Sequence, residues 1–214
     1  MTSDLLRQLG CREITKNKLF ELVEADFSLL PSVLEGILSS KATVRYGCGS
    51  ALVNLSEKHP DKLYPYMNNF VALLDSKYRI LTWNAMAVIA NLTAVDIDRK
   101  FDTIFDKYYS FLGNEYMATV ANVVVNSAII VANKPYLSDK IAVELLKVQK
   151  LQTTPHLTEE CKLVIVEQTL KTLETFFDRI TNKEQVVAFT QKYVNSSRDT
   201  LRKKAQEFIK KDEN

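Results

Sequence analysis

A pattern of small and apolar residues recurs along this chain at intervals of 37 and 39 residues. Within each copy the successive spacings are four, four and three residues. The three copies are Val44, Cys48, Leu52 and Leu55; Leu81, Ala85, Ile89 and Leu92; and Val120, Val124, Ala128 and Val131. Spacings of three and four place side chains on one face of an α-helix. A recurrence at nearly forty residues predicts a repeat architecture, in which each unit buries its apolar face against its neighbours.

Each of these helices follows another amphipathic segment, so the predicted repeating unit is a hairpin of a first and a second helix. The predicted pairs are 30–38 with 45–58, 62–74 with 79–93, 99–111 with 117–133, 139–150 with 159–177, and 183–194 with 201–210. The chain has only five glycines and five prolines, which favours helices joined by short connections. We therefore predict an all-α fold of about five helical hairpins in a single domain, 1–214. Residues 1–26 would form N-terminal capping helices, and 27–211 the repeats.

The second helix of the first predicted hairpin begins with a recognisable motif. Residues 44–52 read V-R-x-x-(small)-(small)-x-A-L, and Leu201-Arg202-x-x-Ala205 repeats the opening of that motif. This pattern resembles the HEAT repeat of the HEAT and armadillo-like solenoids. The resemblance implies a right-handed α–α superhelix whose second helices line a concave face. It also implies a protein- or peptide-binding scaffold. From the shared apolar stripe we further expect Ala85, Ile89, Val124 and Ala128 to be buried between repeats.

Residues that could carry chemistry are sparse. The three cysteines are far apart, and the two histidines, His59 and His156, lie beside prolines in predicted connections. These residues assemble no metal site of the common spacings and no nucleophile–base pair. The glycine-rich phosphate-binding motifs are also missing from the sequence. We predict that the protein is not an enzyme, with no catalytic residue, no metal and no cofactor.

The charge and hydropathy of the chain indicate its location and class of partner. The formal charge is +2 and the isoelectric point about 8.3, without the basic surplus of most nucleic-acid binders. The longest apolar stretch, 120–132, contains polar residues and is too short to span a bilayer. The N-terminal sequence lacks the pattern of a signal peptide. We expect a cytoplasmic protein that binds a protein or peptide and no membrane.

Asparagines are frequent in the predicted second helices. They are Asn54, Asn84, Asn91, Asn122, Asn126 and Asn133. Asn54 and Asn91 are 37 residues apart and so occupy equivalent positions in adjacent repeats. Because an amide both donates and accepts hydrogen bonds, Asn54, Asn91 and Asn126 could form a polar ladder that binds an extended peptide. The alternative is structural, with these amides bonding helix ends or adjacent repeats.

Four further residues complete the predicted binding set: Arg45, Trp83, Arg202 and Lys203. Arg45 and Arg202 follow predicted turns, where ion pairing or packing within the stack is the alternative role. Residues 198–211 carry six basic and two acidic side chains. This basic C-terminal cap supports an alternative function, a HEAT-like protein that binds nucleic acid. A solvated terminal cap is the structural alternative for the same residues.

Overall fold

The computed structural model describes residues 2–212, and the side chains of residues 4–211. Within this part of the chain the structure is helical, apart from turns and an isolated antiparallel bridge between Thr154 and Leu157. The chain divides into two compact units, which we call unit 1 (residues up to Phe101) and unit 2 (residues from Asp102). The all-α fold predicted from the repeat is confirmed. None of the described helices combines the length and the hydropathy that crossing a membrane requires.

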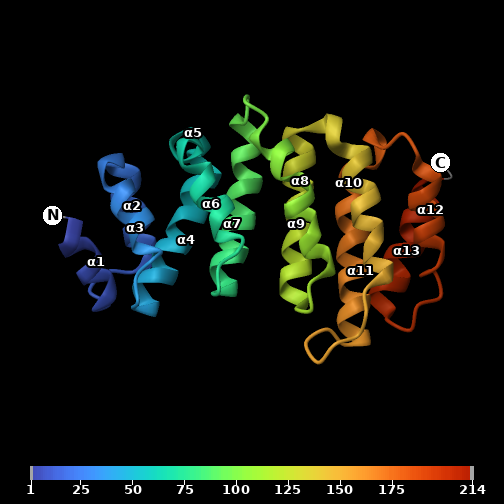
Figure 1. Cartoon of the computed structure of the whole chain (residues 1–214). Helices are drawn as coiled ribbons and strands as arrows, with labels where there is room; N and C mark the ends of the chain where they lie inside the picture. Colours follow the sequence, from blue (N-terminus) through green and yellow to red (C-terminus); the bar gives the residue numbers. More distant parts are fainter. Residues whose placement is uncertain (1, 213–214) are drawn as a thin grey trace. The chain divides into compact units, whose positions relative to one another are not determined.

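Unit 1 is organised around α4, the first of the predicted second helices. Its helices are α1 (Thr2–Gly10), α2 (Lys16–Ala25), α3 (Leu30–Gly36), α4 (Ala42–Lys58), α5 (Pro60–Leu63), α6 (Met67–Leu73) and α7 (Arg79–Leu92). Helix α4 packs against α1, α2, α3 and α7, and Figure 1 shows α4, α6 and α7 side by side. A Cβ atom on Gly47 would lie 3.0 Å from a methyl of Leu9 in α1, and one on Gly49 would lie 2.4 Å from Nδ2 of Asn84 in α7. Glycine at these two positions therefore allows both neighbouring helices to approach α4 closely.

Unit 2 continues the alternation of first and second helices. They are α8 (Lys100–Ser110), which begins at the boundary of the units, α9 (Met117–Asn133), α10 (Ser138–Leu145), α11 (Glu159–Glu174), α12 (Lys183–Gln191) and α13 (Asp199–Asp212). Helix α11 packs between the second helices α9 and α13. The five predicted hairpins thus all occur, and their second helices are α4, α7, α9, α11 and α13.

The predicted core residues are buried with one exception. Ala85, Ile89 and Val124 are fully buried, which confirms the register of the apolar stripe on α7 and α9. Ala128 is only half-buried, so its predicted burial is wrong. The reason is its side of α9: Ala128 lies three residues after Val125, which is 46% exposed, and four before the exposed Ala132.

Four of the turns that precede the second helices share a contact that the repeat pattern did not predict. In each of them a polar side-chain oxygen accepts a hydrogen bond from the backbone amide two residues ahead, at 3.0–3.3 Å. The accepting residues are Ser39, Ser76, Asn114 and Ser196. Such local bonds hold the chain in a turn and keep it out of the preceding helix. They explain why α4, α7, α9 and α13 each begin three residues after the accepting residue.

Candidate functional site

A partly exposed polar stripe runs along the second helices of unit 1. We call it the second-helix face: Thr43, Ser50 and Asn54 of α4, with Ile80, Asn84, Ala87 and Asn91 of α7. Residues 43, 50 and 54 correspond to residues 80, 87 and 91 after a shift of 37 residues. The spacings of three and four along α7 keep its members on one side of the helix. Because α4 and α7 pack together, the two sets form one surface.

The two asparagines in equivalent register differ in their bonding. Both Asn54 and Asn91 are half-buried, as a partly exposed ladder requires. Nδ2 of Asn91 donates to Oγ of Ser56 in α4 at 2.9 Å, and Ser56 donates in turn to the carbonyl of Val53. The side chain of Asn54 makes no hydrogen bond within the described part of the chain. The amide of Asn91 is thus engaged between repeats, whereas that of Asn54 is available to a ligand.

Asn84 extends this surface, although it was not among the predicted site residues. Its side chain lies against Gly49 of α4 and makes no hydrogen bond to any described residue. The sequence signal was the glycine at the facing position of the preceding repeat, where a larger residue would have displaced the amide. Trp83, the neighbour of Asn84, is half-buried on the same helix.

A groove of about 550 Å³ lies beside this face, and we call it the N-terminal groove. Its lining comes from α1, the α1–α2 connection, the start of α2, α4 and α7: Leu9, Arg12, Ile14, Thr15, Lys16, Thr43, Tyr46, Gly47, Ser50, Ile80 and Asn84. Four of these residues also belong to the second-helix face. The groove therefore joins apolar side chains, hydroxyl and amide groups, and two cations in one concavity.

The predicted arginines have a structural role in common. Arg45 is 5% exposed, and its Nη1 donates to the carbonyls of Ser39 and Ser40 at 2.7 and 3.1 Å. Its guanidinium also lies 3.8 Å from the ring centre of Tyr78. Arg202 donates from Nη1 to the carbonyl of Ser196 at 3.0 Å, again six residues earlier. Both arginines thus bond the turn before their own helix, and the burial of Arg45 leaves it little surface for a partner.

Asn126 of α9 does not extend a ladder onto the exposed face of unit 2. It is 7% exposed, and its side chain is hydrogen-bonded to the hydroxyl of Tyr108 in α8. Burial raises the pKa of this tyrosine well above its ordinary value, so the hydroxyl is neutral and can share a hydrogen bond with the amide. The structural alternative accounts for Asn126.

Three of the six cations of the basic C-terminal cap pair with glutamates on one face of α11. Glu160, Glu167 and Glu174 follow one another at intervals of seven residues, which is two helical turns. Arg198 pairs with Glu160 and Glu167, while Lys204 and Lys211 pair with Glu174. Lys203 is exposed and pairs with no carboxylate within residues 4–211. The glutamate spacing was visible in the sequence, but its meaning depends on α13 lying beside α11.

Glu167 is the most buried carboxylate in this set. Glu167 is 8% exposed, and burial by itself would raise the pKa of its carboxyl group. The hydrogen bonds from Lys171, Thr200 and Arg198, at 2.6, 2.6 and 3.0 Å, outweigh that effect and lower the pKa to about 2. Glu167 is therefore charged throughout the physiological range and binds α13 to α11.

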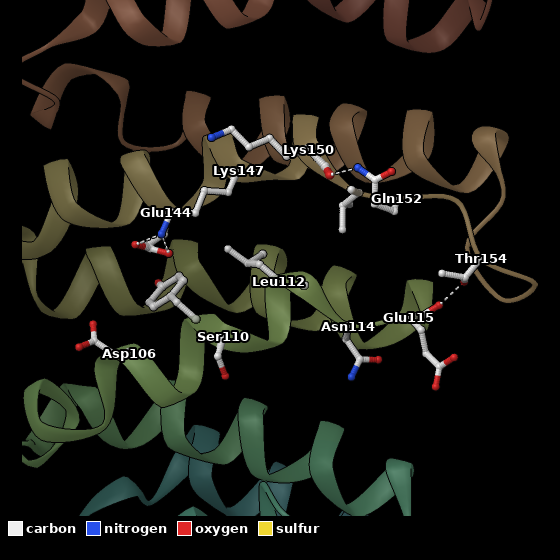
Figure 2. A pocket seen from close by; sticks show the side chains of 13 residues that line it. Asp106, Ser110, Leu112, Asn114, Glu115, Glu144, Lys147, Lys150, Gln152 and Thr154 are labelled. Carbon is white, nitrogen blue, oxygen red and sulfur yellow. Dashed lines mark hydrogen bonds and ion pairs between the residues drawn. The ribbon is translucent and has the colours of Figure 1, made fainter.

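Unit 2 has a larger groove, of about 650 Å³, between the C-terminal ends of α8 and α10 (Figure 2). Figure 2 shows Glu144 and Lys147 on one wall, where Nζ of Lys147 lies 2.6 Å from both carboxylate oxygens of Glu144. At the far end, Thr154 donates to the carbonyl of Glu115 at 3.0 Å. Tyr109, which also lines the groove, is buried; its hydroxyl lies 3.0 Å from that of Ser127, and burial raises its pKa. The lining contains no cysteine or histidine.

The cysteines and histidines occupy separate structural environments. Burial raises the pKa of Cys48 to about 12, so its thiol is neutral and unreactive at neutral pH. Nε2 of His59 lies 2.9 Å from a carboxylate oxygen of Glu24, and the ring of His156 stacks on Tyr116. Among the described residues, no group of three or more histidine, cysteine, aspartate or glutamate side chains is placed to hold a metal ion.

Comparison with solved structures places this arrangement among known folds. A designed armadillo repeat protein matches over 98% of this chain and 92% of its own, with a TM-score of 0.53 and 16% identity. The fold is that of an armadillo-like α-solenoid. An engineered protein also matches over 98% of this chain and 87% of its own, with a TM-score of 0.47 and 15% identity. No protein-family model matches the sequence, and no curated protein matches it.

Proposed function

We propose that the chain is a non-enzymatic scaffold that binds a segment of a protein partner along the second-helix face of unit 1. One observation carries this proposal. The amides of Asn54 and Asn84 lie on a partly exposed surface and have no hydrogen-bond partner within the described residues, and Ile80 beside them is 41% exposed. Each amide offers both a donor and an acceptor to the backbone of an extended peptide. Ile80 offers apolar area that a bound side chain would remove from water.

The other parts of this proposal follow from the fold and the composition. A solenoid displays a long surface made of neighbouring repeats, which suits the binding of an extended segment. We infer that the partner is a protein, that the chain acts in the cytoplasm, and that residues 1–214 function as one domain without a catalytic role. Nucleic-acid binding through the C-terminal cap receives no support from the geometry, because Arg198, Lys204 and Lys211 are paired with glutamates.

Selection from a displayed library of random peptides tests the proposal. The purified protein should enrich peptides whose affinity falls at least about tenfold in the Asn54→Ala, Asn84→Ala double variant, since two hydrogen bonds contribute roughly 1 kcal/mol each. Asn68→Ala is the matched control, because Asn68 is an exposed asparagine of the first helix α6. Peptides that bind the double variant as tightly as the wild type would refute the assigned surface. Failure to enrich any peptide would refute the function.

A further inference from the structure

The N-terminal groove carries charge of one sign. Arg12 and Lys16 line it, whereas no aspartate or glutamate does. Neither cation has a hydrogen bond or an ion pair from its side chain to any residue within 4–211. This holds although the surrounding segment, 4–35, is acidic overall, with four basic and six acidic residues.

The neighbouring carboxylates are engaged elsewhere. Glu13 pairs with Arg7 at 2.8 Å, and Arg7 pairs also with Asp4 at 2.8 Å. Glu21 pairs with Lys18 at 3.0 Å. These pairs leave the positive charges of the groove without an internal counter-ion. A bound anion would therefore replace only water at Arg12 and Lys16.

Arg12 also has a backbone conformation that is unusual for a residue other than glycine. The amides of Arg12 and Glu13 donate to the carbonyls of Leu9 and Gln8, which is the Schellman ending of a helix. Arg12 occupies the left-handed position of this motif, with φ of 61°, where glycine is the usual residue. A residue that breaks a local preference and makes no side-chain hydrogen bond or ion pair within residues 4–211 is expected at functional or strained sites.

The rest of the groove limits what anion it fits. Leu9, Ile14 and Ile80 give it apolar walls, and Asn84 gives it an amide without a hydrogen bond to any described residue. Two cations are few for a nucleic-acid backbone, whose affinity depends on neutralising many phosphates. A peptide segment in which carboxylate and aliphatic side chains alternate matches the lining better. Its backbone would also hydrogen-bond the amide of Asn84.

We propose that the N-terminal groove binds an acidic segment of a protein partner. Its aspartate or glutamate side chains would pair with Arg12 and Lys16, and an adjacent aliphatic side chain would contact Ile80. The proposal rests on the proposed function, because the groove shares Thr43, Ser50, Ile80 and Asn84 with the second-helix face. To the proposed function it adds the chemical class of the bound segment, which is acidic.

The test measures fluorescence anisotropy with three labelled peptides of equal length, in which leucine alternates with glutamate, glutamine or lysine. The glutamate peptide should bind most tightly, and added salt should weaken it. The Arg12→Ala, Lys16→Ala double variant should lose about five- to tenfold in affinity for it, which corresponds to two exposed ion pairs. The matched control is Lys62→Ala with Lys192→Ala, two exposed lysines that lie outside this groove and outside the predicted binding residues.

The outcomes separate this inference from the proposed function. Equal binding of the glutamate and glutamine peptides, sensitive to Asn54→Ala, would overturn the acidic preference and leave peptide binding intact. Absence of binding by all three peptides, together with an empty library selection, would overturn both. A single-stranded oligonucleotide of equal charge that binds more tightly than the glutamate peptide, and is lost in the Arg12→Ala, Lys16→Ala variant, would overturn the assignment to a protein segment.

Discussion

At the scale of single residues, substitutions of Arg12 can measure the cost of its backbone conformation separately from the binding role proposed for its side chain. A non-glycine residue in the left-handed region costs about 1–2 kcal/mol, which glycine avoids, although glycine gains entropy in the unfolded chain. We expect Arg12→Gly to be more stable than Arg12→Ala by about 0.5–1 kcal/mol, measured by urea unfolding. Both variants should lose affinity for the glutamate peptide equally. Equal stability of the two variants would show that the left-handed backbone carries no cost here.

Asn54 and Asn91 provide a second test at this scale. Asn91→Ala removes the hydrogen bond to Ser56 and should lower the free energy of unfolding by about 1 kcal/mol. Asn54→Ala removes no internal hydrogen bond and should change it by less than about 0.5 kcal/mol. Adding Ser56→Ala to each variant tests whether the lost hydrogen bond is the cause. The effects on the free energy of unfolding should be non-additive only for the pair of residues 56 and 91. A larger loss in Asn54→Ala than in Asn91→Ala would contradict the observed bonding.

The difference between these two asparagines shows what the repeat could predict and what it could not. The 37-residue shift predicted correctly that they share a register and are partly exposed. It could not predict their partners, because the hydrogen bond of Asn91 depends on a serine in the neighbouring repeat. The helix before α4 in the stack is α2, which lies outside the repeating pattern. The 37-residue shift therefore predicts no equivalent partner for Asn54. The hydrogen bond of Asn126 was unpredictable for a similar reason, since its partner, Tyr108, comes from α8.

At the scale of elements, the contact between α11 and α13 should give unit 2 a dependence on acid. The pKa of Glu167 is about 2 in the folded protein, below its ordinary value of 4.5. A lowered pKa contributes stability that is fully present above about pH 4.5 and is lost as the pH falls toward 2, by at most about 3 kcal/mol. Glu167→Gln should therefore flatten the fall in melting temperature between these pH values. Glu184→Gln, at an exposed glutamate of α12, should leave it unchanged.

The elements themselves were largely predictable, because their periodicity is local. Helix α9 has the predicted bounds, 117–133, and the other second helices begin and end within a few residues of theirs. The predicted helix 62–74 is instead divided into α5 and α6 by a 3-10 turn, Tyr64–Tyr66. Pro65 explains the break, since proline removes an amide donor and clashes with the preceding turn. The ion pairs between α11 and α13 were not predictable, because they join residues 30 to 38 positions apart.

At the scale of the whole molecule, the distribution of charge distinguishes a protein-binding scaffold from a nucleic-acid binder. The formal charge of +2 is small, and at least four of the six cations of the C-terminal cap are held in ion pairs: Arg198, Arg202, Lys204 and Lys211. We therefore expect a random DNA duplex to bind more weakly than about 100 μM at physiological salt, the weak end of non-specific affinities. Fluorescence anisotropy with a labelled duplex measures this. Arg202→Ala with Lys203→Ala should change nothing further, because Arg202 bonds its own turn and Lys203 contributes one charge. Micromolar binding that weakens steeply with salt and is lost in this double variant would instead identify the C-terminal cap as a nucleic-acid site.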